Sequence, residues 1–278
     1  MKKNYLLILS LLFSHPLYAD CQQGEIIFNQ ATANKNLQQA LDEFQQSATL
    51  CPNYTVYYEQ GRTLFKLERS DEALQSFKQA LHYSEANSGN EANALARIAL
   101  VYFKKDAMQQ ASLYVEKAYI ISKQNSPHWI LRLRKDIDIQ NASHIASAKE
   151  IKQALLDGKN FGVRTKIKFN SITFKFNSTE FTPQGQQQVA ELGKALVDHL
   201  TDRQQALIIG HTDKIGDETY NQTLSEQRAE KVKKALVGIN PAYSRRIKTQ
   251  GKGESELRYF GDSEQDHQLN RRVEMQLP

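Results

Sequence analysis

The sequence predicts an N-terminal α-helical repeat domain followed by a C-terminal α/β domain with a mixed sheet. Two patterns lead to this fold class. Apolar residues recur at helical spacing in similar segments of the first half, and from Lys166 onward they alternate with polar residues, as in half-buried strands. The length of 278 residues suits about two domains, and 40% hydrophobic residues are enough for packed cores.

Residues 1–19 are typical of a secretory signal peptide. Two lysines precede a mostly apolar run over residues 5–13, which is too short to span a bilayer as a helix. Pro16 then breaks the run, and Ala19 supplies a small residue for cleavage. Removing 19 of the 278 residues leaves 259 that start at Asp20, and the loss of two lysines lowers the net charge from +5 to +3. We expect no transmembrane segment in this mature chain, because no later run is apolar for long enough.

The two cysteines limit the chemistry of the chain. Two thiols cannot form a four-thiolate zinc site, and the scattered histidines suggest no other metal site. Asp20 stands where lipidation of Cys21 would require a small residue, so we expect an exported protein without a lipid anchor. In an oxidising compartment Cys21 and Cys51 can pair, and we expect a disulfide rather than two unpaired thiols. Such a loop of about 30 residues contributes about 3 kcal/mol in the chain-entropy model.

The charge of the chain does not indicate a nucleic-acid partner. The 36 lysines and arginines are interspersed with 31 aspartates and glutamates. Nucleic-acid binders usually concentrate their positive charge on one face. We therefore expect no nucleic-acid binding.

Three segments of the first half repeat one helical pattern. They begin at Ala40, Ala73 and Ala111, with offsets of 33 and 38 residues, and the longer step holds a polar insertion at residues 85–90. Small or apolar residues recur in each segment at positions that share one face of a helix. A second helix precedes the later segments and carries a small residue, such as Gly61, that allows close helix packing.

These segments resemble tetratricopeptide repeats. The units would span residues 21–54, 54–87 and 92–125, and residues 127–157 would form one or two capping helices. Phe28 stands where the first unit should have a small residue, and the expected disulfide would compensate for this weak unit. The resemblance implies that residues 20–157 bind an unidentified protein partner along a concave surface. The alternative is a spacer that sets a distance.

The second half follows a βαβαβ-type order. Strands are expected at residues 166–169, 172–176, 206–209, 246–249 and 272–275, and helices at 183–200 and 218–237. The alternation slips by one residue at Asn170 and Ser171, which indicates a bulge or two short strands. Thr182 and Pro183 are suited to cap and begin the first helix. Residues 158–164 are expected to link the two domains.

Four ordered motifs of this half resemble the OmpA-like domain, the C-terminal peptidoglycan-binding module of outer-membrane protein A and related envelope proteins. They are Ile172–Asn177, Gly210-His211-Thr212-Asp213 with Gly216, Tyr220-Asn221 through Leu224-Ser225 to Arg228-Ala229, and Asn270-Arg271-Arg272-Val273-Glu274. The resemblance covers residues 165–278 and implies an OmpA-like fold. It also implies binding of the peptide stem of peptidoglycan, chiefly diaminopimelic acid, with no cofactor and no cleavage.

The resemblance assigns Asp213 and Arg228 to the free end of diaminopimelate. That end carries an ammonium and a carboxylate on one carbon, so a site for it needs one anion and one fork-shaped cation. Asp213 would take the ammonium, and Arg228, fifteen residues later on a predicted helix, would take the carboxylate. Guanidinium can bind a carboxylate bidentately, which an ammonium cannot. An internal Asp213–Arg228 salt bridge without a ligand is the alternative.

The resemblance adds five residues to this site: Asn177, Thr212, Asn221, Leu224 and Arg272. Asn221 and Leu224 share a helical face with Arg228. Asn221 and Thr212 would add hydrogen bonds, Leu224 an apolar wall, and Asn177 the other side of the pocket. Arg272 would hold Asp213 or the ligand.

The sequence as a whole is interpreted as a non-enzymatic, periplasmic protein associated with the cell wall, and outer-membrane association stays open. One rival is an interaction scaffold whose OmpA-like domain has lost wall binding, because Lys175 stands where many members have Asp. A cell-wall hydrolase is the remote rival. It lacks a positioned nucleophile near His211 and Asp213.

Overall fold

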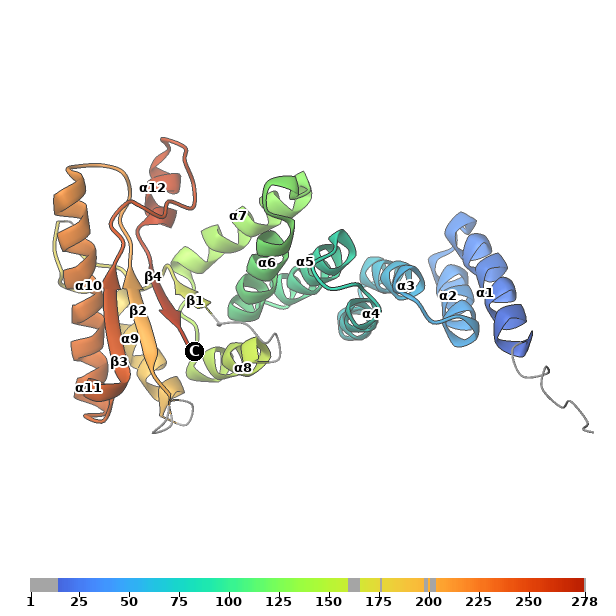
Figure 1. Ribbon diagram of the computed structural model, residues 1–278, viewed down its shortest axis with the longest axis horizontal. Helices are drawn as coiled ribbons and strands as arrows, with labels where there is room; N and C mark the ends of the chain where they lie inside the picture. The colour runs from blue at the N-terminus through green and yellow to red at the C-terminus, as the bar shows by residue number, and fades with distance from the viewer. Residues whose placement is uncertain (1–14, 160–165, 176, 198–199, 201–203, 278) are drawn as a thin grey trace, which may run out of the picture. The chain divides into compact units, whose positions relative to one another are not determined.

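The structure is a computed structural model that describes residues 15–159, 166–175, 177–197, 200 and 204–277 (Figure 1). The chain forms two compact units, Met1–Ala94 and Leu95–Pro278. Residues 1–14 of the predicted signal peptide and 160–164 of the predicted linker lie outside the described residues. The two units meet at residue 94, well before the domain junction expected at residues 158–164.

The first unit consists of helices joined in pairs. Its helices are α1 (His15–Ala33), α2 (Leu37–Leu50), α3 (Tyr54–Lys66) and α4 (Ser70–His82). Within each pair, α1 packs on α2 and α3 packs on α4, while α2 also contacts α3. Asn36 and Asn53 cap α2 and α3, because their side-chain oxygens accept backbone N–H groups of the first turns. The predicted helical fold of this region is confirmed, and it is consistent with helical repeats.

The first two helix pairs differ at the position where a small residue was expected. In the second pair, Gly61 lies so close to the Phe77 ring that a Cβ at residue 61 would sit 2.7 Å from it. The equivalent residues 33 positions earlier are Phe28 and Phe44, whose ring centroids are 5.7 Å apart. An aromatic contact therefore replaces a close helix approach in the first pair.

The expected disulfide is present. Cys21 near the start of α1 is bonded to Cys51, which directly follows α2, and their Cα atoms are 4.6 Å apart. Antiparallel neighbouring helices bring the start of one and the end of the other together. The bond therefore closes the first helix pair at one end.

Four further helices precede the sheet. They are α5 (Gly89–Lys104), which spans the division between the units, α6 (Met108–Ser122), α7 (His128–Ser143) and α8 (Ala148–Lys159), with a short 3-10 helix at Lys123–Asn125. The segment expected to cap the solenoid therefore forms two helices, α7 and α8. Both belong to the same compact unit as the sheet.

The sheet has four strands: β1 (Lys166–Phe169), β2 (Ala206–Gly210), β3 (Ile247–Gly251) and β4 (Val273–Gln276). Their order is β1-β4-β2-β3, with β2 and β3 parallel and β4 antiparallel to both neighbours, which confirms the mixed sheet. The intervening helices are α9 (Pro183–Leu196), α10 (Glu218–Ile239), α11 (Tyr243–Arg246) and α12 (Glu264–Asn270). Thr182 caps α9 as expected, because its hydroxyl accepts the Gly185 N–H.

The strand expected at residues 172–176 forms only an isolated bridge. Phe174 pairs with Phe181 alone, and Phe176 lies outside the described residues. The chain turns at Asn170 and Ser171, directly after β1. A short hairpin around residues 174–181 thus replaces the expected ladder strand.

The two faces of the sheet have opposite character. Ile167, Phe169, Ile208 and Met275 lie in an apolar core with residues of α9 and α10. Lys168 alternates with the first two along β1 and is only 3% exposed, so it is buried on the other side. Helices α6 and α8 contact β1, and α12 contacts α7.

Five ionic side chains fill the space between the preceding helices and the sheet. Lys168 Nζ lies 2.8 Å from Asp138 on α7 and 2.9 Å from Glu116 on α6. Arg258, in the segment before α12, lies 2.7 Å from the same two carboxylates. Arg134 completes the group with a 3.1 Å contact to Glu116. We call these residues the buried charge cluster, and it joins α6 and α7 to β1 and to the loop before α12.

Candidate ligand-binding site

The candidate site begins where β2 ends. Strand β2 stops at Gly210, the chain continues through His211, Thr212 and Asp213, and α10 starts at Glu218. The helix can approach this corner because a Cβ at Gly210 would overlap the backbone carbonyl of Ser225. The close approach places the α10 residues named from the sequence beside the loop that carries Asp213.

Asp213 is buried and held from two directions. It is 6% exposed, and its Oδ2 accepts a hydrogen bond from Arg271 Nη1 at 2.5 Å. Its Oδ1 accepts the backbone N–H of Ile215 at 3.1 Å. Both carboxylate oxygens are therefore engaged by donors, and the side chain has a fixed orientation.

Arg228 lies on α10, 8% exposed, beside the short hairpin of residues 174–181. Its guanidinium lies over the Phe174 ring at 5.0 Å, and Nε donates to the backbone carbonyl of Ser178 at 3.3 Å. Within the described chain its two terminal nitrogens make no hydrogen bond. Burial, and then the neighbouring charge of Arg271, lower the pKa of Arg228 from its ordinary value. Neutralisation of this charge by a carboxylate would be favourable.

The Asp213–Arg228 salt bridge considered as an alternative is not among the ion pairs of the described residues, where Asp213 pairs with Arg271. Arg271 also donates to Glu264 at 2.6 Å through its other terminal nitrogen. A hollow of about 340 Å³ is lined by Arg228, Arg271 and Arg272 together with Phe174 and His211. The acidic residue among those that line the hollow is Glu264, while Asp213 lies next to it as the ion-pair partner of Arg271.

The five supporting residues have different surroundings. Asn221 is buried, and its Nδ2 donates to the Ile215 carbonyl at 3.1 Å and to Glu254 Oε2 at 2.6 Å, so it braces the loop. Thr212 is also buried, and its hydroxyl is without a hydrogen-bond partner in the described part of the chain. Leu224 is half-buried on α10.

Asn177 lies at the surface of the short hairpin. It is exposed and has a left-handed backbone with φ of 48°, which asparagine tolerates better than most residues. Its Oδ1 accepts a hydrogen bond from the Tyr220 hydroxyl at the start of α10. This contact ties the hairpin to α10, and the expectation that Asn177 closes one side of the pocket stays a prediction. The nearby Lys175 is exposed and pairs with Glu180 at 2.7 Å.

Arg272 was expected to hold Asp213 or the ligand; in the described chain Asp213 pairs with Arg271 instead, while Arg272 lines the hollow, so a contact with the ligand stays a prediction. Arg272 is 5% exposed, and Nε donates to Glu274 Oε1 at 2.8 Å while Nη2 donates to the Glu256 carbonyl at 3.2 Å. The preceding Arg271 is the residue that pairs with Asp213.

The structure adds residues that the sequence reasoning missed. Arg271, Glu264 and Tyr220 all contact named site residues or their partners. Two of them stood inside the quoted motifs, Arg271 beside Arg272 and Tyr220 beside Asn221. Glu264 lies outside every motif, so no signal pointed to it.

The described ranges contain neither a metal-binding group of side chains nor a membrane-spanning helix. In them, no group of three or more His, Cys, Asp or Glu side chains is placed to hold a metal ion. None of the described helices is long and apolar enough to cross a membrane.

Comparison with known proteins identifies the C-terminal part of the chain. Residues 173–271 match the OmpA family. The chain is 38% identical to outer membrane protein A of Bordetella avium over 118 residues, 40% of this chain and 57% of that protein. It is 39% identical to outer membrane protein A of Klebsiella aerogenes over 100 residues, 35% of this chain and 26% of that protein.

Among solved structures, the chain is similar to the peptidoglycan-associated lipoprotein from Burkholderia pseudomallei. The identity is 25% and the TM-score 0.35, over 42% of this chain and 92% of that chain. The match to the two curated relatives spans just over half of one and about a quarter of the other. Residues 173–271 are therefore an OmpA-like domain, which follows a helical region in the same chain.

Proposed function

We propose that the OmpA-like domain binds peptidoglycan non-covalently through the diaminopimelate of its peptide stem. The observation that carries the proposal is Arg228, which lines the hollow with both terminal nitrogens unpaired within the described chain. This guanidinium offers a fork for the ligand carboxylate. The buried Asp213 carboxylate, in the adjoining loop, accepts the ammonium on the same carbon. Relatives named outer membrane protein A support the assignment.

In this function the protein is not an enzyme. The proposed site supplies one anion, several guanidiniums and hydrogen-bond donors, which recognise an amino-acid head group and activate no nucleophile. Each charge-assisted contact contributes about 1.5–3 kcal/mol, so single-site affinity falls in the range of roughly micromolar to millimolar. The polymer presents many stems, and rebinding keeps the protein on the wall.

In this proposal the helical region either engages a protein partner or acts as a spacer that sets a distance from the wall. We further infer export to the periplasm, with cleavage after Ala19 and no lipid on Cys21. Mass spectrometry of the protein from the periplasmic fraction tests this part. A mass matching residues 20–278 without a lipid supports it, and an uncleaved or lipidated chain contradicts it.

The decisive experiment is cosedimentation with purified peptidoglycan. We expect the wild-type protein to pellet, and Asp213→Asn and Arg228→Gln each to weaken pelleting by about tenfold or more. Arg245→Gln is the matched control, because Arg245 is an exposed residue of α11 and does not line the hollow. Free meso-diaminopimelate should compete, and lysine blocked at its α-amino and α-carboxyl groups should compete poorly, because its free end has an ammonium but no carboxylate.

Three outcomes would change the interpretation. Equal pelleting of the wild type and all variants would contradict the proposed binding site. A wild-type protein that stays in the supernatant would favour the scaffold. Release of soluble muropeptides during incubation would favour the hydrolase.

A further inference from the structure

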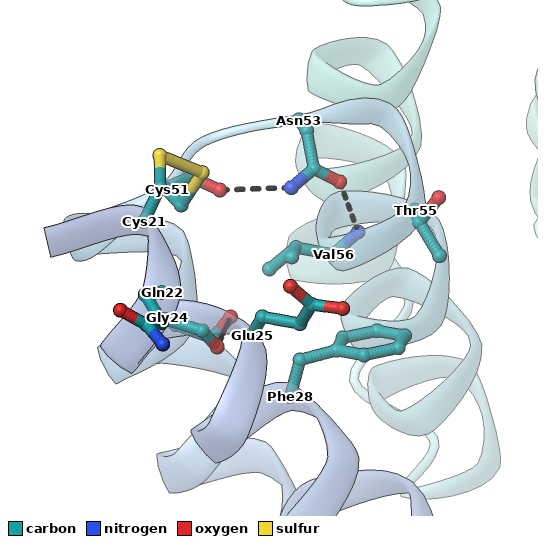
Figure 2. Close-up of a pocket in the computed structure, with 10 residues that line it drawn as sticks. Cys21, Gln22, Gly24, Glu25, Phe28, Cys51, Asn53, Thr55 and Val56 are labelled. Atoms are coloured by element: carbon teal, nitrogen blue, oxygen red, sulfur yellow. Dashed lines mark hydrogen bonds between the residues drawn. A yellow bond between two sulfur atoms is a disulfide. The ribbon is translucent and has the colours of Figure 1, made fainter. Parts of the chain in front are cut away.

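A second hollow, of about 600 Å³, lies entirely within the first compact unit (Figure 2). It is bounded on one side by α1, which contributes Glu25 and Phe28. On the other side are Cys51, at the end of α2, and the segment from Asn53 to Val56 that begins α3. In Figure 2 the side chains of Glu25 and Phe28 project from α1 toward that segment.

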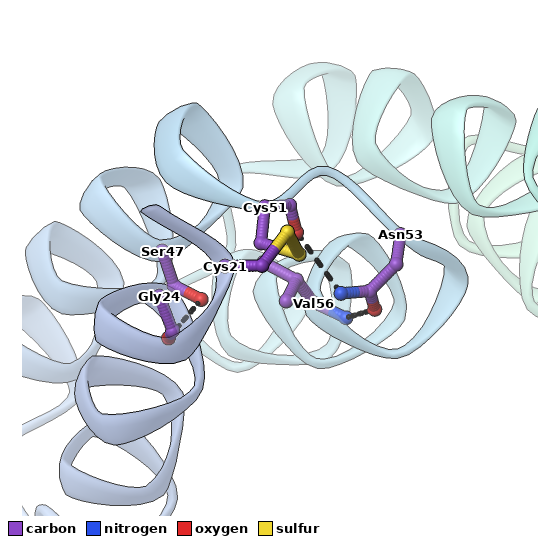
Figure 3. Close-up of a disulfide and its surroundings, with 6 residues drawn as sticks. All are labelled: Cys21, Gly24, Ser47, Cys51, Asn53 and Val56. Carbon is purple, nitrogen blue, oxygen red and sulfur yellow. Dashed lines mark hydrogen bonds between the residues drawn. A yellow bond between two sulfur atoms is a disulfide. The ribbon is translucent and has the colours of Figure 1, made fainter. Parts of the chain in front are cut away.

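The walls of this hollow are fixed by covalent and hydrogen bonds (Figure 3). The disulfide from Cys21 to Cys51 closes one end, and Ser47 Oγ donates to the Gly24 carbonyl at 2.8 Å. Asn53 Nδ2 donates to the Cys51 carbonyl at 2.9 Å. A hollow whose walls are already ordered loses little conformational entropy when a ligand enters.

Glu25 brings a negative charge to the hollow that the protein leaves uncompensated. Its side chain is exposed, and it makes neither a hydrogen bond nor an ion pair within the described part of the chain. In the first turn of α3, the Val56 N–H is donated to Asn53 Oδ1 at 3.1 Å and not to Glu25. Glu25 is also the charged member of the residues that line the hollow.

Phe28 provides an aromatic surface close to this carboxylate on α1. The ring is half-buried and is held from behind by Phe44, with ring centroids 5.7 Å apart. An aromatic face beside a carboxylate suits the long side chain of arginine or lysine, which combines an apolar stem with a cationic end. Residues 20–94 carry ten acidic and five basic side chains, a net charge of −5, which attracts cations from a distance.

From these observations we infer that the hollow of the first helix pair binds an extended, basic segment of a partner protein. An arginine or lysine side chain of that segment pairs with Glu25 and lies against Phe28. The volume exceeds that of one side chain, so neighbouring residues of the segment occupy the rest along Asn53 and Thr55. The inference rests on the interaction role proposed for the helical region and is independent of peptidoglycan binding.

The test uses the purified protein with its disulfide intact and end-blocked, fluorescein-labelled hexapeptides. The basic probe GPRPRG is compared with GPEPEG and GPQPQG, in which proline keeps all three extended. We expect fluorescence anisotropy to show binding of the basic probe alone, weakened by salt. Glu25→Gln should weaken binding about tenfold, and Glu25→Lys should abolish it.

Glu85→Gln is the matched control. It removes the same charge from an exposed residue that does not line the hollow. Circular dichroism confirms that the variants fold. No saturable binding of the basic probe up to millimolar concentration, equal binding of the acidic probe, or equal affinity of wild type and Glu25→Gln would each overturn the inference. Peptidoglycan pelleting of the same Glu25 variants should be unchanged, so a failure here is distinct from a failure of wall binding.

A second copy of the chain is a competing occupant, because residues 95–278 carry 29 basic and 21 acidic side chains, a net charge of +8. Sedimentation velocity separates the two cases. We expect the protein to stay monomeric across the concentrations of the binding assay. A concentration-dependent dimer that Glu25→Gln abolishes would assign the hollow to self-association and would overturn the partner assignment.

Discussion

Arg271 and Asp213 form an ion pair beside the hollow of the OmpA-like domain, with Nη1 of the arginine 2.5 Å from Oδ2 of the aspartate. The same guanidinium reaches Glu264, the first residue of α12, at 2.6 Å. One arginine therefore links the loop after β2 to α12. Asp213, the proposed ammonium acceptor, takes its orientation from a residue adjacent to the one expected to hold it.

Substitutions of Arg271 and Arg272 are predicted to affect different properties, peptidoglycan binding in the first case and stability in the second. Arg271→Gln releases the half-exposed pair with Asp213, so peptidoglycan pelleting should weaken by about tenfold while the fold persists. Arg272→Gln removes the 2.8 Å partner of the buried Glu274 and leaves it the longer contacts to Lys166 and His211, which should cost about 3–5 kcal/mol of unfolding free energy. Peptidoglycan pelleting measures the binding of both variants, and urea unfolding measures their stability, with Arg245→Gln as the control. Wild-type pelleting by Arg271→Gln would show that Asp213 needs no positioning by it.

The buried charge cluster is predicted to hold α6 and α7 against the sheet. Asp138 is fully buried between Lys168 and Arg258, so Asp138→Asn leaves two buried cations with one fewer carboxylate. Removing one partner of such a group typically destabilises by about 3–5 kcal/mol. Asp136→Asn, on the exposed side of the same helix, should change stability by less than about 0.5 kcal/mol. Similar urea midpoints for the two variants would contradict a structural role of the cluster.

The regular elements of this chain were predictable because their signals are local. Thr182 and Pro183 mark the start of α9 through capping chemistry, and the short continuous apolar run that begins at Ala206 marks a buried strand. The Cys21–Cys51 disulfide followed from the pairing of adjacent helices. For the capped helix and the strand, a few neighbouring residues contain the required information, and for the disulfide the chain holds just two cysteines, 30 residues apart.

The features that the sequence reasoning missed depend on residues far apart in the chain. Whether Arg271 or Arg272 faces Asp213 is decided by the register in which Val273 of β4 pairs with Gly210 of β2. Lys168 has the alternation of an exposed strand residue, yet it is buried because α6 and α7, 30 to 52 residues earlier, supply its carboxylates. The same long-range packing puts those helices in one compact unit with the OmpA-like domain.

Acid should lower the stability of the second unit by protonating Asp138 in the buried charge cluster. Burial raises the pKa of Asp138, but the charges of Arg258 and Lys168 lower it more, to about 2 from an ordinary value of 3.8. A carboxyl whose pKa is lower in the folded state stabilises the fold above its unfolded pKa and loses that contribution as pH falls toward the folded value. The loss therefore lies between about pH 4 and pH 2 and is on the order of 2 kcal/mol.

Urea midpoints measured at intervals from pH 5 to pH 2 test this dependence. Asp138→Asn should start from a lower midpoint and fall less steeply below about pH 4, because it lacks the titrating group. Asp136→Asn should follow the wild-type curve, since Asp136 is exposed on the same helix. Parallel curves for the wild type and Asp138→Asn would assign the acid sensitivity to other carboxyls, such as Glu116, whose pKa is also held well below its ordinary value.

Reduction of the disulfide should loosen the first helix pair in particular. The bond spans 30 residues, and losing a loop of this size costs about 3 kcal/mol in the chain-entropy model. We expect dithiothreitol to speed amide exchange in α1, whose other ties to the end of α2 include the Ser47–Gly24 hydrogen bond. The double variant Cys21→Ser, Cys51→Ser should show the same fast exchange with or without reductant. If the wild type keeps slow exchange in α1 after both thiols have been titrated as free, then helix packing alone holds the pair together, and the disulfide does not compensate for Phe28.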